Sequence, residues 1–339
     1  MLAMSGPTFA PQAAIWHFIL ERLTRRERVA LLVVAAESKG HAPGKPGFKM
    51  AVGADGQLCG SIGGGAIEFD TVAAARDLLG RRQRVATVAL KVHEPHHPQT
   101  SGMICGGSQT VVTYPCRTGD RAAVATLLQA LEAGQPGALE LTADGIAFDP
   151  LRRNRRQFDF VDQPDAWSFT EQIPVPDTVY LIGGGHVARA LSRVLATLDF
   201  RIVVIDERAE VNAAEWNPHA HDRRILPFSK IGKAISPGPQ SYVVIMTPGH
   251  RSDELALRQL ARKRLRYLGV LASKRKALEL LESLASAGYP PESLARVRTP
   301  IGLPIASHTP AEIAISIAAQ LIQVRNCGAD VAAVCNRHA

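Results

Sequence analysis

Residues 179–188 read Val-Tyr-Leu-Ile-Gly-Gly-Gly-His-Val-Ala, an apolar strand, a glycine turn and the start of a helix. Gly183 and Gly185 occupy the first two glycine positions of the G-x-G-x-x-G/A fingerprint, and Ala188 takes the third. The first glycine allows the tight turn, the second lets a pyrophosphate approach the backbone, and the third small residue lets the helix pack on the strand. Asp206 ends the next apolar run, 23 residues after Gly183, where an acid can bond ribose hydroxyls. This order predicts a dinucleotide-binding α/β unit.

The chain around this turn alternates short apolar runs with amphipathic segments. Continuous apolar strands that alternate with helices are typical of a parallel sheet covered on both faces. The sequence therefore predicts a Rossmann-like, doubly wound α/β domain over residues 178–339. Its expected strands are 179–182, 202–205, 242–247 and 267–271, and its expected helices are 187–198, 253–264, 273–287 and 310–325.

Two local patterns belong to this domain. Thr309-Pro-Ala-Glu312 fits the start of the last helix, with Thr309 as N-cap and Glu312 returning to the cap. His186 follows the last glycine, where a small or apolar residue would be ordinary, and Arg208 beside Asp206 can serve a second phosphate or point to solvent. A Rossmann fold with an empty or degenerate site is therefore the alternative to a bound nucleotide or dinucleotide.

The first 150 residues follow a different pattern and predict a separate α/β domain with a mixed sheet. Helices are expected over 13–26, 67–79 and 119–133, and strands over 28–37, 85–90 and 109–114. Residues 151–177 combine arginines, aromatic residues and three prolines, a composition typical of an inter-domain connection. The predicted organisation is thus an N-terminal domain over 1–150, a linker over 151–177 and the Rossmann-like domain.

A second glycine run, Gly63, Gly64 and Gly65, lies in the segment Gly60-Ser-Ile-Gly-Gly-Gly-Ala-Ile-Glu68. It follows a short strand and opens a helix, so its amides can cradle an oxyanion. Ser61 can donate to a phosphate, and Glu68 can bond the edge of a ring or complement the helix dipole. Lys49 can supply a positive charge or lie on the surface. Because the lysine and hydroxyl pair of a P-loop is missing, hydrolysis of nucleoside triphosphates is not indicated.

Cys105 lies in a second unusual loop, Met103-Ile-Cys-Gly-Gly107. Gly106 and Gly107 expose backbone amides beside a thiol that can become a thiolate, ligate a soft metal such as molybdenum, or carry sulfur. A small buried hydrophobe is the alternative for a single cysteine. The chain has five cysteines and no CxxC pair, which argues against a disulfide framework and a structural zinc site.

The composition of the 339 residues is that of a soluble globular protein, with 46% hydrophobic and 21% charged residues. We expect a cytoplasmic protein, because no apolar run reaches the length of a bilayer span and the N-terminus lacks the order of a signal peptide. Lysine and arginine exceed acidic residues by 39 to 31, which suits an anionic ligand. Aromatic residues do not alternate with the basic clusters, so nucleic acid is not the expected partner.

These motifs together resemble the xanthine dehydrogenase accessory family, XdhC/CoxI. The matches run in order from about residue 38 to residue 325, nearly the whole chain. The N-terminal ones are Pro46-Gly-Phe-Lys-Met50 and the two loops at 60–68 and 103–107. The C-terminal ones are 181–188, Asp206-Glu-Arg208, Tyr267-Leu-Gly269, Ser273-Lys-Arg275, 298–303 and 309–319.

The resemblance implies a maturation factor for molybdenum hydroxylases such as xanthine dehydrogenase. Such proteins bind molybdenum cofactor, a molybdopterin, support its sulfuration with a cysteine desulfurase, and deliver it to the apo-enzyme. By position, Cys105 and the two glycine loops are the candidates for contact with the cofactor, and a homodimer is plausible. The chain departs from the family pattern at Ala272, where glycine is usual, and after Thr247, where Pro248 and Gly249 replace a His-Asp sequence.

Three functions follow from these observations. The first is a cofactor carrier and insertion chaperone that is not an enzyme. The second is an NAD(P)-dependent oxidoreductase that uses the Rossmann-like domain, although no pair of residues is typical of hydride transfer. The third is an enzyme that moves sulfur to the cofactor through a persulfide on Cys105.

Overall fold

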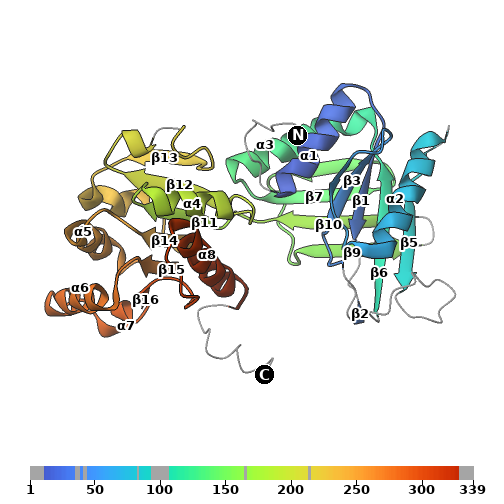
Figure 1. The fold of residues 1–339 in the computed structure, drawn as a ribbon. Helices are drawn as coiled ribbons and strands as arrows, with labels where there is room; N and C mark the ends of the chain where they lie inside the picture. Colours follow the sequence, from blue (N-terminus) through green and yellow to red (C-terminus); the bar gives the residue numbers. More distant parts are fainter. Residues whose placement is uncertain are drawn as a thin grey trace. The chain divides into compact units, whose positions relative to one another are not determined.

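The computed structural model divides the chain into two compact units, one over Pro11–Val175 and the other from Pro176 onward (Figure 1). It describes residues 11–34, 39–40, 44–81, 84–92, 107–163, 166–212 and 215–327. The loop residues Cys105 and Gly106 lie outside these ranges.

The C-terminal unit is built on one six-stranded sheet with the order β13-β12-β11-β14-β15-β16. Every registered strand pair in it is parallel. This is the order 3-2-1-4-5-6 of dinucleotide-binding folds, and the order reverses between β11 and β14. The strands are β11 (Thr178–Ile182), β12 (Arg201–Asp206), β13 (Asp222–Ile225), β14 (Gly238–Ile245), β15 (Leu265–Val270) and β16 (Val297–Arg298).

Helices cover both faces of this sheet, so the side chains of its central strand, β11, are buried on both sides. Val179 and Leu181 of β11 pack with the core of α4 and α8, whereas Tyr180 and Ile182 pack with the core of α5 and α6. Successive strand residues point to opposite faces, which explains the continuous apolar run. The helices are α4 (His186–Leu195), α5 (His250–Leu260), α6 (Lys274–Ser286), α7 (Pro291–Leu294) and α8 (Pro310–Cys327).

The start of α8 has the predicted capping box. The Glu312 carboxylate accepts hydrogen bonds from the amides of His308 and Thr309 at 2.8 and 2.9 Å, and the Glu312 amide donates to the Thr309 hydroxyl at 3.3 Å. These bonds satisfy donors that the first helical turn leaves free.

The N-terminal unit contains two sheets whose registered strand pairs are all antiparallel. The first sheet has the order β2-β6-β1-β3-β4, with β5 on β6, and the second has the order β8-β7-β10-β9. The first comprises β1 (Val29–Val34), β2 (Lys39–Gly40), β3 (Lys49–Gly53), β4 (Leu58–Gly60), β5 (Thr87–Val92) and β6 (Gly107–Pro115). The second comprises β7 (Gly137–Thr142), β8 (Ile146–Asp149), β9 (Phe158–Gln163) and β10 (Ala166–Ile173). The helices of this unit are α1 (Pro11–Thr24), α2 (Gly65–Gly80) and α3 (Arg121–Ala133).

The segment predicted to be a linker, residues 151–177, is mostly part of the second sheet. β10 pairs with β7 on one side and β9 on the other, and Phe169 of β10 is completely buried. The linker prediction was wrong here because the arginines and prolines of the segment flank the strands instead of interrupting them. The chain leaves the N-terminal unit near Val175.

The predicted α/β class is confirmed, with a Rossmann-like parallel sheet in the C-terminal unit. The mixed sheet predicted for the N-terminal domain was wrong, because the registered strand pairs of both its sheets are antiparallel. Among the described residues, no helix is both long and apolar enough to cross a membrane.

Candidate functional site

A buried glutamine joins the glycine-rich segments of the N-terminal unit. Gln109, near the start of β6, is completely buried. Its Oε1 accepts a hydrogen bond from the Gly44 amide at 3.0 Å, and its Nε2 donates to the Ile62 carbonyl at 3.4 Å. A Cβ on Gly44 would lie 2.4 Å from that carbonyl oxygen, so the close approach requires glycine. Because β6 begins at Gly107, the end of the 103–107 motif lies next to this junction.

No sequence motif includes Gln109. Its only local signal is an uncharged polar side chain near the start of a strand that continues as Val111 and Val112. Burying an amide side chain is costly unless its donors and acceptors are paired, and here two separate loops pair with it. Gln109 therefore fixes the loop at Gly44 to the loop at Ile62.

The loop 60–68 has the backbone geometry of an anion cradle. Gly60, Gly63, Gly64 and Gly65 all have positive φ, from 73° to 125°. A Cβ placed on Gly64 would have no atom within 4 Å, so one side of the loop is open. Successive amides in such a conformation point to one side and favour a negative charge there.

The carboxylate of Glu68 supplies the negative charge in this cradle. Glu68 Oε2 accepts hydrogen bonds from the Ser61 hydroxyl at 2.7 Å and from the amides of Ile62 and Gly64 at 3.1 and 3.0 Å. The Ser61 hydroxyl in turn accepts from the Gly63 amide at 3.1 Å. Ser61 and Glu68 therefore bond each other and the loop, and an external oxyanion would compete with the Glu68 carboxylate for these amides.

Lys49 places its side chain in a buried ion pair, while its backbone carbonyl accepts a hydrogen bond from the Ser61 amide of this loop at 3.0 Å. Its Nζ is 2.5 Å from Glu171 Oε2 and also donates to the Gly47 carbonyl at 2.8 Å. Both side chains are less than a tenth exposed, so the lysine charge is already compensated. The expectation of a lysine that offers its charge to a ligand does not hold in this structure, because a β10 carboxylate takes that charge.

Of the third motif, only Gly107 is described, as the first residue of β6. The predicted thiolate Cys105 and its neighbour Gly106 lie outside the described residues, so their role stays a prediction. Among the residues that the structure does describe, no group of three or more His, Cys, Asp or Glu side chains could hold a metal ion.

The glycine turn of the C-terminal unit lies between β11 and α4. Gly183 has a φ of 103°, and a Cβ there would lie 2.4 Å from the Met246 carbonyl oxygen at the end of β14. Gly185 caps α4 with a φ of −69°, and a Cβ there would have no atom within 4 Å. The first glycine is thus required by packing, whereas the second leaves open space beside the helix N-terminus, the place of a pyrophosphate in this fold.

Asp206, at the end of β12, is completely buried and bonded to protein groups. Its carboxylate accepts from the Gly184 amide at 2.7 Å and from Arg208 Nε and Nη2 at 3.0 and 2.8 Å. Burial raises the pKa of this carboxyl, but the bonds from Arg208 and the Gly184 amide lower the pKa more, and the net pKa lies below its ordinary value. Asp206 therefore holds the glycine turn, and its pairing with Arg208 takes up acceptors that a ribose would need.

An aromatic side chain covers the same turn. Trp216 donates from Nε1 to the Gly184 carbonyl at 2.7 Å. The His186 ring meets the Trp216 ring edge-on, with centroids 5.2 Å apart, and the Arg189 guanidinium lies 5.0 Å from that ring's centroid. His186, singled out in the sequence, is thus exposed and packed beside Trp216, which no local motif identified.

At the second departure from the family pattern, just after β14, Thr247 is hydrogen-bonded to Asp253. The Thr247 hydroxyl and amide both donate to the Asp253 carboxylate, at 2.6 and 3.1 Å. Burial raises the pKa of Asp253. The threonine and the acid therefore form a hydrogen-bonded pair although residues 248–252 lie between them in the sequence.

Comparison with protein-family models matches both units. Residues 179–321 match the XdhC Rossmann domain, and residues 23–89 match the XdhC and CoxI family. The second match includes Lys49, the loop 60–68 and Glu68, and the first includes the Gly183 turn.

Two curated proteins and one solved structure are similar to the chain. It is 37% identical over 147 residues to the uncharacterized protein YqeB of Escherichia coli, and 28% identical over 158 residues to a protein of Bacillus subtilis named as a probable xanthine dehydrogenase subunit. These matches cover 43% and 46% of this chain but only 27% and 46% of the relatives. The chain therefore spans less than half the length of either curated relative.

The solved structure is a crystal structure of a xanthine dehydrogenase from Bacillus halodurans. It superposes with a TM-score of 0.70 at 24% identity, over 92% of this chain and 96% of that one. This likeness concerns the fold, and the family follows from the two models. By its N-terminal and its Rossmann segments, the chain belongs to the XdhC and CoxI family.

Proposed function

We propose that this protein binds molybdenum cofactor, a molybdopterin, in its N-terminal unit and delivers it to an apo molybdenum hydroxylase such as xanthine dehydrogenase. Family membership supports a role in xanthine dehydrogenase maturation. The names of two similar proteins, a xanthine dehydrogenase and a probable xanthine dehydrogenase subunit, point to the same class of client.

One observation carries the choice of the N-terminal unit. Gln109 joins the Gly44 loop to the glycine loop at Ile62, and β6 begins at Gly107, the last residue of the 103–107 motif. A phosphate-bearing pterin needs backbone amides for its phosphate, and a thiolate is compatible with molybdenum. The joined glycine loops offer the amides, and Cys105, two residues before β6 in the sequence, offers the thiolate, which favours a carrier.

Sulfuration of the bound cofactor would need a sulfur donor, and a cysteine desulfurase is the class of partner that supplies one. We propose that the carrier works in the cytoplasm as a homodimer and presents the molybdenum end of the cofactor to that enzyme. Labelled sulfur retained on Cys105 during this exchange, and absent in Cys105→Ala, would instead support a sulfur-transfer enzyme.

Cofactor delivery tests this proposal. The protein would be purified from a host that makes molybdopterin and mixed with an apo molybdenum hydroxylase, and recovery of hydroxylase activity would be followed over time. We expect faster and more complete recovery than with an equal amount of free cofactor, and a loss of this advantage with Cys105→Ala. Equal recovery with and without the protein would refute delivery.

A second candidate, an NAD(P)-dependent oxidoreductase, is favoured by the strand order of the C-terminal sheet and by the open space at Gly185. The pairing of Asp206 with Arg208 weighs against it, because the acid expected to bond the ribose is engaged within the protein. Titration with NADH would decide between a nucleotide site and a structural Rossmann domain.

A further inference from the structure

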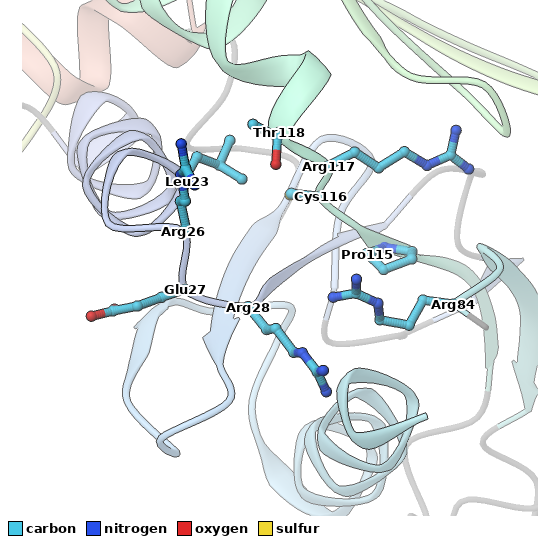
Figure 2. A pocket seen from close by; sticks show the side chains of 9 residues that line it. All are labelled: Leu23, Arg26, Glu27, Arg28, Arg84, Pro115, Cys116, Arg117 and Thr118. Atoms are coloured by element: carbon cyan, nitrogen blue, oxygen red, sulfur yellow. The ribbon is translucent and has the colours of Figure 1, made fainter. Parts of the chain in front are cut away.

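A second feature of the N-terminal unit lies at the other end of β6 from the glycine loops. It is a pocket of about 410 Å³ between the end of α1, the turn that follows it, and the end of β6 (Figure 2). Four arginines line it: Arg26, Arg28, Arg84 and Arg117. The end of β6 at Pro115 is six residues from Gln109, roughly 20 Å along an extended strand, so the pocket is separate from the cofactor site proposed above.

Two of the arginines are held in place by backbone carbonyls. Arg28 donates from Nη1 to the Leu79 carbonyl at 2.8 Å, near the end of α2. Arg117 donates to the carbonyls of Ala143 and Asp144, both at 2.9 Å, and its guanidinium turns away from the others in Figure 2. By contrast, the guanidinium groups of Arg26 and Arg84 have no hydrogen-bond partner within the described part of the chain.

The backbone of Arg26 adds an independent observation. Its φ is 58°, in the left-handed region that glycine usually fills at the end of a helix. The Glu27 amide closes the helix on the Arg22 carbonyl at 2.8 Å, a bond that glycine at position 26 would allow with less strain. The Arg26 side chain thus leaves the backbone from a strained turn that lines the pocket.

Among the described residues that line the pocket, no carboxylate pairs with the four arginines. The one carboxylate of the pocket, Glu27, is paired with Arg22, whose Nη1 lies 3.0 Å from its Oε2. Burial raises the pKa of the Cys116 thiol, so this wall of the pocket is uncharged at neutral pH. The pocket thus has a strong excess of positive charge.

We propose that this pocket binds the phosphate group of a small phosphorylated molecule. Guanidinium groups match phosphate oxygens in geometry, and a doubly charged phosphate suits several arginines better than a single carboxylate does. The volume lies in the range of small-molecule sites and exceeds the need of a phosphate alone, so there is room for an organic part. Arg84 binds the phosphate, with Arg28 beside it, and Arg26 adds positive charge at the other side of the pocket (Figure 2).

Isothermal titration of the full-length protein at low ionic strength tests this assignment. The probes are inorganic pyrophosphate and adenosine 5′-monophosphate, which distinguish a bare phosphate from one with an organic part. We expect at least one probe to bind, and Arg84→Gln to weaken that binding about tenfold or more, as loss of a charge-assisted contact does. Arg81→Gln is the matched control, because it removes the same charge from a nearby arginine outside the lining that pairs with Asp77.

Arg26→Gly separates binding from folding. Glycine adopts a φ of 58° without strain, so this variant should melt no lower than the parent protein, yet bind the probe about twofold or more weakly, because the pocket loses one positive charge. The proposal would be overturned if neither probe binds at millimolar concentration, or if Arg81→Gln weakens binding as much as Arg84→Gln does. Unchanged affinity in both Arg26→Gly and Arg84→Gln would overturn it equally.

Discussion

The carboxylate of Glu68 occupies the glycine loop at the start of α2. It accepts three hydrogen bonds from a loop that sequence reasoning assigned to an external oxyanion. The two interpretations are compatible if a ligand replaces Glu68, because an amide cradle that holds a carboxylate also suits a phosphate. The open space beside Gly64 leaves access for such a ligand.

Glu68→Ala should free these amides. We expect the variant to lose about 1–3 kcal/mol of unfolding free energy, because three donors lose a charged acceptor. Sulfate should then raise its melting temperature more than it raises that of the parent protein, since the vacated cradle binds the anion in the folded state only. Thermal melts in sulfate and chloride measure this difference. The exposed Glu282→Ala is the control, and an equal response of both variants to sulfate would argue against an anion cradle.

The pH dependence of stability in Arg208→Met tests the pairing of Arg208 with the buried Asp206. The pKa of Asp206 is lowered in the folded state, so the pairing stabilises the fold above the ordinary carboxyl pKa of about 3.9 and is lost as pH falls through the lower folded pKa. The parent protein should exceed the variant by about 1–3 kcal/mol from pH 7 to 5, and the gap should close below about pH 4. Urea unfolding at each pH measures it, with the exposed Arg251→Met as control. A gap unchanged at pH 3 would contradict this assignment.

The turn between β11 and α4 depends on two glycines for different reasons. Gly183 is needed because a Cβ there would lie 2.4 Å from the Met246 carbonyl oxygen at the end of β14, whereas Gly185 borders open space. Single substitutions can therefore separate the folding role of the turn from a binding role.

Gly183→Ala should destabilise the C-terminal unit by about 2–4 kcal/mol, because a Cβ at a φ of 103° is strained and overlaps the Met246 carbonyl. Gly185→Ala should change stability by less than about 0.5 kcal/mol, yet fill the space where a pyrophosphate would approach. Chemical unfolding and NADH fluorescence titration measure the two effects. NADH binding that survives Gly185→Ala unchanged would place any nucleotide away from this turn.

Elements with a strong local pattern were predictable from the sequence. The four predicted strands of the C-terminal sheet are confirmed, because a strand buried on both faces needs a continuous apolar run. β13 was not predicted, since Asp222-Arg-Arg-Ile225 is a half-exposed edge strand with three charged residues. β9 and β10 were assigned to a linker, although the alternation of Phe158, Asp159 and Phe160 fits a strand with one exposed face.

At the scale of the molecule, each unit has its own buried core. The candidate site of the N-terminal unit could be predicted only in part. The bonds from Glu68 to its loop span seven residues or fewer and follow from a glycine run before a helix. The links from Gln109 to Gly44 and from Lys49 to Glu171 span 65 and 122 residues. No local pattern in a single sequence encodes such pairs, which arise from strand order.

The cofactor content of the purified protein tests the carrier account most directly. Protein from a host that makes molybdopterin would be denatured, and the released pterin would be oxidised and quantified by fluorescence against total protein. The variant Cys105→Ala would be measured in parallel, with Cys327→Ala in the other unit as the matched control. We predict nearly one pterin per chain in the parent protein and in Cys327→Ala, and a clear loss in Cys105→Ala. No pterin in the parent protein, or equal pterin in all three samples, would contradict a carrier whose site includes Cys105.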